Sequence, residues 1–480
     1  MLNKILYNLK KYPEDVCYQI RDKIYKNKDL YKYVCNIYHY LIKNCKHQDK
    51  IIVYGHKEIY MIASFLACSF AGITYIPIDI SIPEERRKKI INQVQPKITI
   101  DSRIEQIMNT DIYQDISDIY MQYEDIYYII FTSGSTGEPK GVQITYSNII
   151  SCMDWLTKIC NINNDTILNQ ANYSFDLSVA DIYLPLLTRS KHYILQREIQ
   201  RDFPKLFKEL KNSNAGLAVM TPSFADLLMA DKSFNNKLMP KLRKILFCGE
   251  RLTEKTVLRL NERFGNLQII NSYGPTECTF AVTSTIVKPN DEISVGIPKD
   301  DVDIYIVNDN LNILEDKEIG EILITGKSVG KGYLNEQLNK NAFITFNDKR
   351  AYLTGDLGYK KNNQIYCIGR KDKQIKFKGY RIELLEIENT LNKLDYIEKA
   401  YVTTLKQDDN SVKRIIAFVK LNSDLYTNKD IKKHIETLLP SYMIPTIKVV
   451  NTIPLTENGK VNENILLGVN NERKNNWYNY

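Results

Sequence analysis

Apolar positions in the first part of the chain alternate between short unbroken runs and longer amphipathic stretches. The runs are rich in β-branched and aromatic residues, which predicts buried strands, for example at Ile126–Phe131, Lys244–Phe247 and Leu267–Ile270. Helical periodicity separates such runs from Tyr31 to Leu187. Strands that alternate with helices indicate βαβ units, and therefore an α/β region with mostly parallel sheets.

The pattern changes toward the C-terminus. After Asp291 the chain is richer in short strands and turns. Further on, we expect two strands at Ala400–Thr404 and Arg414–Val419. A helix is predicted at Lys429–Leu439, and Pro440 ends it because proline cannot continue the backbone hydrogen bonding. This part of the chain is typical of a small α+β domain.

A chain of 480 residues is too long for one hydrophobic core, so two or more domains are expected. We predict a large α/β N-terminal region of several subdomains with parallel sheets, residues 1–371. A small α+β C-terminal domain is predicted for residues 372–480.

One segment carries no charge over a length that could span a bilayer, namely Ile59–Ile78. It contains Gly72 and Pro77, and Gly72 falls where a helix would stop. We interpret it as a buried helix, a turn and a strand. A membrane span is the minority alternative.

Charge and cysteine content limit the class of protein. The net charge of +8 is mild for this length, and no dense Lys/Arg block indicates nucleic-acid binding, although a diffuse positive surface suits an acidic partner. The nine cysteines are odd in number and form no C-x-x-C pair, which favours reduced thiols in the cytoplasm over a disulfide framework or a zinc site. The N-terminus lacks the features of a signal peptide.

The segment Phe131-Thr-Ser-Gly-Ser-Thr-Gly-Glu-Pro-Lys-Gly141 follows a predicted strand. Its hydroxyls and backbone N–H groups could bind phosphate oxygens, Gly134 and Gly137 allow close approach, and Lys140 adds a positive charge. The P-loop spacing is absent, so an ordinary surface loop is an equal alternative on local chemistry alone.

Three further clusters are ambiguous by themselves. Asn271-Ser-Tyr-Gly-Pro-Thr-Glu277 offers a ring for a purine and a carboxylate for Mg²⁺, or is a plain Gly-Pro turn. Tyr352-Leu-Thr-Gly-Asp356 carries an Asp that could simply cap a turn. Asn458-Gly-Lys460 could be an Asn-Gly turn with an exposed lysine.

Taken together, these motifs resemble those of the adenylate-forming superfamily, which includes acyl-CoA synthetases, luciferases and the adenylation domains that charge carrier proteins. The loop at 132–141 is similar to its signature loop, and the other three clusters match its later motifs in order. The similarity covers nearly the whole chain. It is closest to D-alanine–carrier protein ligases through Val53-Tyr-Gly-His56, Tyr173-Ser-Phe-Asp-Leu-Ser-Val179 and Leu246-Phe-Cys-Gly-Glu250.

The resemblance implies roles for particular residues. Lys460 would be the catalytic residue, bridging the substrate carboxylate and the α-phosphate, where a mobile ammonium can stabilise developing negative charge. Glu277 would bind Mg²⁺, Asp356 the ribose, and Asp372 would be the hinge to a mobile C-terminal lid. The full set expected to bind ATP is Thr132, Ser133, Gly134, Ser135, Thr136, Gly137, Lys140, Asn271, Ser272, Tyr273, Gly274, Pro275, Thr276, Asp356, Cys367, Ile368, Gly369, Arg370 and Lys460.

Asp176 discriminates among substrates. In members that activate amino acids, an Asp at this position pairs with the α-ammonium of the substrate, whereas a helix-capping Asp is the alternative. Cys248 falls where the D-alanine subgroup has a pocket cysteine, or it is a small core residue. Ala180 and Phe280 replace the usual Met and Val, and Ser272 replaces the usual Thr, so the predicted pocket is reshaped. Lys460 would also contact the substrate.

The function that the resemblance implies is ATP-dependent activation of a small amino acid, with D-alanine favoured. The aminoacyl-AMP would then pass its acyl group to the phosphopantetheine thiol of a separate carrier protein, with ATP and Mg²⁺ as cofactors. Three alternatives stay open: a standalone nonribosomal-peptide-type adenylation enzyme for another small amino acid, an acyl-CoA synthetase, and a catalytically silent carrier-binding protein. We expect no nucleic-acid partner and no membrane insertion.

Overall fold

The computed structural model describes residues 1–111, 113–134, 137–407, 411–423, 425–455 and 461–468. It divides into two compact units. Unit 1 contains residues 1–80, 89–132 and 140–372, and unit 2 contains residues 81–88, 133–139 and 373–480. Ser135, Thr136 and Lys460 are not among the described residues, and their predicted roles stay predictions.

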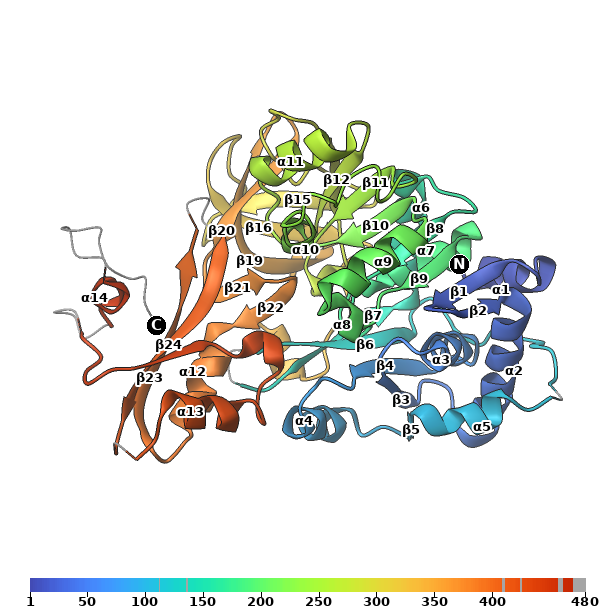
Figure 1. Ribbon diagram of the computed structural model, residues 1–480, viewed down its shortest axis with the longest axis horizontal. Helices are drawn as coiled ribbons and strands as arrows, with labels where there is room; N and C mark the ends of the chain where they lie inside the picture. Colours follow the sequence, from blue (N-terminus) through green and yellow to red (C-terminus); the bar gives the residue numbers. More distant parts are fainter. Residues whose placement is uncertain (112, 135–136, 408–410, 424, 456–460, 469–480) are drawn as a thin grey trace. The chain divides into compact units, whose positions relative to one another are not determined.

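A nine-stranded sheet forms one part of unit 1 (Figure 1). Its strands run in the order β14-β13-β12-β11-β10-β8-β9-β1-β2. The strands from β12 to β1 are parallel, and antiparallel pairs flank them at both edges. Their bounds are β1 (Val16–Ile20), β2 (Lys23–Lys26), β8 (Thr166–Asn169), β9 (Lys191–Ile194), β10 (Leu217–Met220), β11 (Lys244–Phe247), β12 (Gln268–Tyr273), β13 (Thr283–Val287) and β14 (Ile297–Pro298).

A six-stranded sheet forms the second part, in the order β17-β7-β6-β4-β3-β5. The strands are β3 (Lys50–Gly55), β4 (Thr74–Asp79), β5 (Ile98–Ile100), β6 (Ile126–Thr132), β7 (Lys140–Thr145) and β17 (Gly332–Tyr333). The α-helices of the chain up to Phe264 are α1 (Leu2–Lys11), α2 (Asn27–Asn44), α3 (Ile59–Phe70), α4 (Glu84–Val94), α5 (Glu105–Met108), α6 (Tyr146–Cys160), α7 (Ser178–Thr188), α8 (Arg197–Gln200), α9 (Phe203–Ser213), α10 (Pro222–Leu228) and α11 (Glu254–Phe264).

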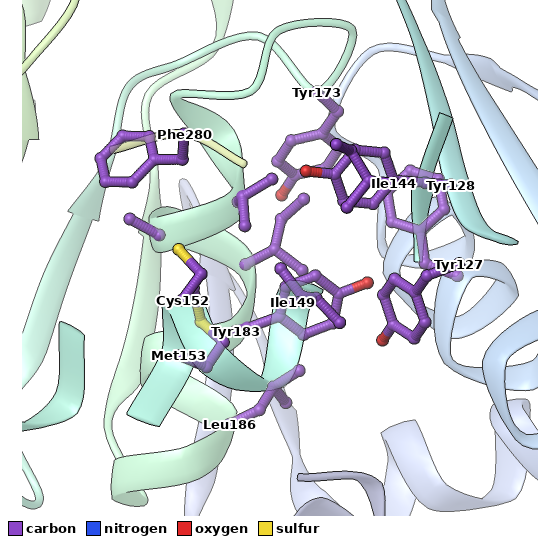
Figure 2. Packing of buried hydrophobic residues seen from close by; sticks show 14 of the residues in the cluster. Tyr127, Tyr128, Ile144, Ile149, Cys152, Met153, Tyr173, Tyr183, Leu186 and Phe280 are labelled. Atoms are coloured by element: carbon purple, nitrogen blue, oxygen red, sulfur yellow. The ribbon is translucent and has the colours of Figure 1, made fainter. Parts of the chain in front are cut away.

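Residues from both sheets meet in one hydrophobic core in which tyrosines are prominent (Figure 2). Tyr127 and Tyr128 of β6 lie there with Tyr183 of α7. The hydroxyls of Tyr75 and Tyr183 are 2.7 Å apart and fully buried, so this core contains a paired polar contact. A buried hydroxyl without a partner would be costly, and the pairing therefore lets Tyr75 and Tyr183 fill space here. All nine cysteines are among the described residues; they are free, and seven are buried.

The uncharged segment after β3 is a buried helix followed by a strand, as predicted. Every residue of α3 is buried, and Gly72, with φ +69°, makes the turn into β4. Within the described part of the chain, no helix is long and apolar enough to cross a membrane.

The remainder of unit 1 is an antiparallel sheet in which β15-β16-β19-β18 are neighbours and β20 pairs with β19. The bounds are β15 (Val302–Val307), β16 (Gly320–Gly326), β18 (Phe343–Phe346), β19 (Lys349–Lys361) and β20 (Gln364–Arg370). The turn between β19 and β20 uses Asn362 and Asn363, both with positive φ. Two left-handed residues match the twist of a tight hairpin.

Unit 2 has a hydrophobic core of its own. Its elements are β21 (Gln374–Phe377), β22 (Tyr380–Glu383), α12 (Leu384–Asn392), β23 (Ile397–Lys406), β24 (Val412–Leu421), α13 (Asn428–Ile435), β25 (Thr446–Val449) and α14 (Glu463–Leu467). The strands predicted at 400–404 and 414–419 lie inside β23 and β24. Parallel and antiparallel pairs occur in the same three-stranded sheet.

One predicted boundary was wrong, because α13 ends at Ile435 and not at Leu439. The backbone bonds change character there: Leu438 N–H donates to the carbonyl of Ile435, three residues back, at 3.0 Å. The residue before a proline is disfavoured in the α conformation, so the last turn tightens ahead of Pro440.

Leu323 provides a test of the core of unit 1. It is fully buried in β16 and packs with Val307 and Ala351. Leu323→Ala is expected to destabilise the protein by about 2–5 kcal/mol, since it leaves a cavity that the sheet cannot close. Denaturant unfolding would measure the loss. The exposed Thr345 of β18 is the matched control, and Thr345→Ala should change stability by no more than about 0.5 kcal/mol; equal effects would contradict the packing.

Candidate active site

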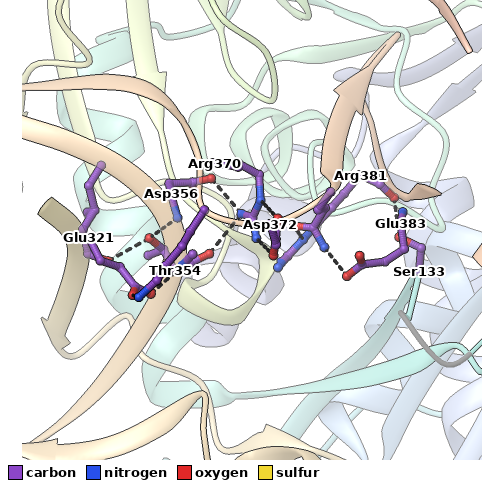
Figure 3. A network of polar contacts seen from close by, with 12 residues as sticks. Ser133, Glu321, Thr354, Asp356, Arg370, Asp372, Arg381 and Glu383 are labelled. Atoms are coloured by element: carbon purple, nitrogen blue, oxygen red, sulfur yellow. Dashed lines mark hydrogen bonds and ion pairs between the residues drawn. The ribbon is translucent and has the colours of Figure 1, made fainter. Parts of the chain in front are cut away.

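A buried carboxylate, Asp356, joins three strands of unit 1, and Figure 3 shows its contact with Arg370. Asp356 on β19 accepts hydrogen bonds from the hydroxyl of Tyr273 and from the guanidinium of Arg370, each at 2.7 Å. Tyr273 ends β12 and Arg370 ends β20, so residues far apart in the sequence meet at one carboxylate. Burial raises the pKa of Tyr273 well above its usual value, and the negative charge of Asp356 raises it further. Tyr273 is therefore a neutral donor at physiological pH.

The Arg370 guanidinium also holds Asp372. Its Nε and Nη2 donate to the two carboxylate oxygens of Asp372, both at 2.7 Å, which is the strong bidentate geometry. Gly355 permits this approach, because a Cβ there would lie 2.6 Å from Arg370 Nη2. The neighbouring Cys367 is half-buried, whereas Ile368 and Gly369 are exposed.

The two residues before Tyr273 are held in place by hydrogen bonds from their own side chains. Asn271 donates to the carbonyl of Ser294 and Ser272 to that of Phe247, each at 2.7 Å. After Tyr273 the chain makes the turn at Gly274, Pro275 and Thr276. A Cβ on Gly274 would lie 2.5 Å from Ala281 Cα, so only glycine allows this turn to pack against the following loop.

Glu277 is fully buried directly after that turn. Its carboxylate accepts a hydrogen bond from the hydroxyl of Tyr333 at 2.6 Å, and the hydroxyl of Tyr352 lies 3.3 Å from that of Tyr333. The described residues contain no cluster of three or more His, Cys, Asp or Glu that could hold a metal by itself. A single carboxylate fits Mg²⁺, which usually takes one or two protein carboxylates together with phosphate oxygens and water.

The glycine- and hydroxyl-rich loop begins and ends on paired strands. Thr132 of β6 pairs with Lys140 of β7, and both belong to unit 1. Lys140 Nζ lies 5.9 Å from the centroid of the Tyr333 ring. The ammonium is thus brought to the residue that also contacts Glu277.

Ser133, Gly134 and Gly137 belong to unit 2. Ser133 Oγ donates to the carbonyl of Arg381 at 2.7 Å and accepts the N–H of Glu383 at 3.1 Å (Figure 3). The N–H of Gly134 donates to the Glu386 carboxylate at 3.1 Å. Gly137 has φ +83°, a conformation that glycine adopts without strain.

Glu386 also forms an ion pair with Arg86, and both side chains are buried. Burying two charges is favourable only when the geometry is good and the remaining polar atoms are satisfied. Glu386 meets this condition because its two oxygens have different partners, the Arg86 guanidinium and the Gly134 amide. The loop backbone in unit 2 therefore donates to a carboxylate.

Asp176 lies half-buried in the turn between β8 and α7. Its carbonyl accepts the N–H of Val179 at 2.9 Å, which begins the helix on which Ala180 is fully buried. Burial raises the pKa of Cys152 to about 12, and the charge of Asp176 is among the smaller causes. The carboxylate is therefore within electrostatic reach of the hydrophobic core near Cys152.

Cys248 and Phe280 are brought together in unit 1. Cys248 Sγ lies 3.8 Å from the carbonyl oxygen of Phe280, and both residues are buried. Thr279 and Phe280 have φ of +60° and +72°, two consecutive left-handed residues that are not glycine. Such conformations cost of order 1–3 kcal/mol each and cluster at ligand-binding sites.

Comparison with known proteins identifies the family. The model of the AMP-binding enzyme family matches residues 7–334, and that of the AMP-binding enzyme C-terminal domain matches residues 386–460. The chain belongs to the AMP-binding enzyme family. This confirms the resemblance to adenylate-forming enzymes.

Curated relatives within this family are D-alanine–D-alanyl carrier protein ligases. The one from Bacillus licheniformis is 38% identical over 439 residues, which is 86% of this chain and 87% of the relative. The one from Listeria monocytogenes is 35% identical over 491 residues, or 95% of this chain and 96% of the relative.

Solved structures of adenylation domains share the fold. An adenylation domain of Vibrio cholerae in complex with glycyl-adenosine-5′-phosphate has a TM-score of 0.85 at 20% identity, covering 98% of this chain and 97% of that one. An artificially fused adenylation–PCP di-domain from Klebsiella oxytoca has a TM-score of 0.82 at 20% identity, covering 94% and 93%. These likenesses confirm the predicted fold class.

The sequence interpretation missed Tyr333, Tyr352 and Glu386. Tyr333 and Tyr352 are two of the 33 tyrosines in the chain, and no spacing marks a tyrosine whose hydroxyl contacts a buried carboxylate. Glu386 lies in the first turn of α12, where an acidic residue is expected for helix stability alone.

Tyr333 tests the contact with Glu277. In Tyr333→Phe the buried carboxylate loses a donor, and the expected cost is about 1–3 kcal/mol of stability. Tyr359→Phe is a matched control, because the Tyr359 hydroxyl donates to an exposed carboxylate, Glu292, at 3.2 Å. Thermal unfolding should show a clear loss for the first variant and almost none for the second. Equal midpoints would reject the contact as a source of stability.

Proposed function

We propose that this protein activates a small amino acid, with D-alanine favoured, and loads it onto a separate carrier protein. The observation that carries the proposal is the identity of 35–38% with D-alanine–D-alanyl carrier protein ligases over 86–95% of the chain. ATP supplies the energy and leaves as AMP and pyrophosphate. We expect the protein to act in the cytoplasm.

The proposed reaction has two steps. In the first, a carboxylate oxygen of the amino acid attacks the α-phosphorus of ATP, and the bond to the β-phosphate oxygen breaks to release pyrophosphate. In the second, the sulfur of a phosphopantetheine thiol attacks the acyl carbon, the thiol proton is lost, and AMP leaves with the bonding electrons. No nucleophile of this chain is required, because the mixed anhydride carries the activation.

Nucleotide binding is assigned to the cluster around Asp356. Its carboxylate forms an ion pair with Arg370, and ribose hydroxyls are suitable donors to it. Tyr273 is held by the same carboxylate, so its ring would be fixed beside the nucleoside. We expect the positive charge of Arg370 to stabilise the negatively charged phosphates as well.

Mg²⁺ is assigned to Glu277, whose buried carboxylate is held by Tyr333. When bound, the ion would neutralise part of the phosphate charge. Lys140, near the same tyrosine, would add a second positive charge for the phosphates. Lys460 keeps its predicted role at the carboxylate–phosphate junction.

Amino-acid recognition is assigned to Asp176. A carboxylate at the edge of an apolar core strongly favours a substrate that brings an ammonium. The Cys248 thiol contacts the main-chain carbonyl of Phe280, and both residues are buried, so we expect little free space at this position, which supports a small side chain. That contact also favours a second candidate, an adenylation enzyme for another small amino acid such as glycine.

An exchange assay across a panel of amino acids tests the proposal. D-Alanine or another small uncharged amino acid should give the fastest ATP–pyrophosphate exchange, since a larger side chain would meet Phe280. A holo carrier protein mixed with the enzyme, ATP and that amino acid should gain the aminoacyl mass. If the enzyme instead loads propionate onto CoA efficiently and loads no carrier protein, it is an acyl-CoA synthetase.

Asp176→Asn is the sharper test of substrate class. The change removes the charge while keeping the size, and the loss of binding free energy for D-alanine is expected to be about 2 kcal/mol or more, seen as a raised KM. The KM for ATP should change little. Asp154→Asn, an exposed change on α6, is the control and should leave both constants unchanged. Unaltered KM for the amino acid in Asp176→Asn would remove this residue from recognition.

A further inference from the structure

A lysine is fully enclosed in unit 1. Lys57 follows β3 in the turn before α3, is 1% exposed, and has φ +60°. Its carbonyl accepts the hydroxyl hydrogen bond of Tyr18, so both backbone and side chain are fixed. Placing an ammonium out of water is costly unless every donor finds an acceptor, and this lysine therefore needs partners inside the protein.

The Lys57 ammonium has three acceptors, which matches its three donors. Nζ donates to the carbonyls of Gln170 at 2.7 Å, Leu195 at 2.9 Å and Asn169 at 3.3 Å. Asn169 ends β8, and Leu195 directly follows β9. The ammonium thus binds the chain at the point where β8 leaves the sheet.

Asp181 contacts the same short stretch, but it accepts hydrogen bonds from amides, whereas Lys57 donates to carbonyls. This fully buried carboxylate on α7 accepts the N–H groups of Gln170 and Ala171, each at 3.2 Å. Burial lowers the pKa of Lys57 and raises that of Asp181, and the charge of each opposes the shift in the other. The carbonyl and the amide of Gln170 are therefore held by two buried side chains, Lys57 and Asp181.

The stretch held in this way leads into Asp176. Asp181 lies on the helix that follows Asp176 and bonds to the strand end that precedes it, so the intervening chain is a closed loop. Ser174 within the loop accepts the N–H of Asp79 at 2.7 Å. The backbone on both sides of Asp176 therefore has its position set by buried groups.

We propose that Lys57 and Asp181 are positioning residues for substrate recognition: they hold residues 169–181 so that the Asp176 carboxylate meets the ammonium of the amino acid. The inference rests on the proposed function of Asp176. Neither residue touches the reacting atoms in this account. Their effect is on the geometry of the recognition loop, and a displacement of about 1 Å at such a site can cost a hundredfold in rate.

Lys57→Met tests the ammonium, because methionine keeps the length but cannot donate. Asp181→Leu removes the acceptor, whereas Asp181→Asn keeps an oxygen for the two amides and serves as the conservative variant. Leu323→Ala is the control for general destabilisation, since it loosens a separate hydrophobic cluster. Steady-state pyrophosphate exchange with D-alanine and with ATP varied separately gives both KM values.

We expect Lys57→Met and Asp181→Leu to raise the KM for D-alanine about tenfold or more, with the KM for ATP within about twofold. Asp181→Asn should recover most of the loss. Hydrogen exchange at the amides of Gln170 and Ala171 should accelerate in Asp181→Leu and stay slow in Leu323→Ala. Unchanged KM for D-alanine in a folded Lys57→Met protein, or equal changes in the control, would overturn the positioning role.

Two further arrangements keep the experiment decisive. If Lys57→Met does not fold, Gln200→Ala replaces it, since the half-buried Gln200 donates to the carbonyls of Gln170 at 3.1 Å and Leu195 at 3.0 Å. The same raised KM for D-alanine would support the proposal, and an unchanged KM would oppose it. If the wild-type protein shows no pyrophosphate exchange with any amino acid, the proposed function itself is rejected. If the wild-type protein exchanges normally and the variants leave the KM for D-alanine unchanged, only the positioning role is rejected.

Discussion

A charge that leaves water must find a partner inside the protein, and unit 1 meets this requirement where strands end. Lys57 is held by carbonyls just beyond β8 and β9. Asp356 is held by Tyr273 and Arg370, which end β12 and β20. Each pairing connects segments that are distant in the sequence. The polar contacts thus fix the loops that a parallel sheet leaves at its edge.

The fold explains why these contacts gather. In parallel sheets, loops that follow the strands lie along one edge, and ligands are bound there in open α/β folds. β8, β10, β11 and β12 are neighbours in this order in the large sheet. The loops after β8 and β11 carry Asp176 and Cys248, and Tyr273 ends β12. Residues far apart in the chain therefore come from neighbouring strands of one sheet.

Much of this architecture is predictable from pattern. The strand at Lys244–Phe247 matches β11, because its three apolar residues at 245–247 form a short run between turn signals. The end of α13 was not predictable, since it depends on how the chain tightens before Pro440. Lys57 gives no signal at all: a lysine in a turn is ordinarily exposed, and its burial depends on carbonyls more than a hundred residues away. The roles of Asp176 and Lys460 came from the resemblance, and they remain predictions.

Burial also determines what the cysteines can do. The thiolate, not the thiol, is the nucleophile, and burial raises the pKa of Cys152 and Cys160 to about 12. Burial raises the pKa of Cys17 and Cys68 further. At neutral pH these side chains are inert thiols. In a reaction that ends when an external thiol takes an activated acyl group, the protein's own buried sulfurs therefore do not compete for it.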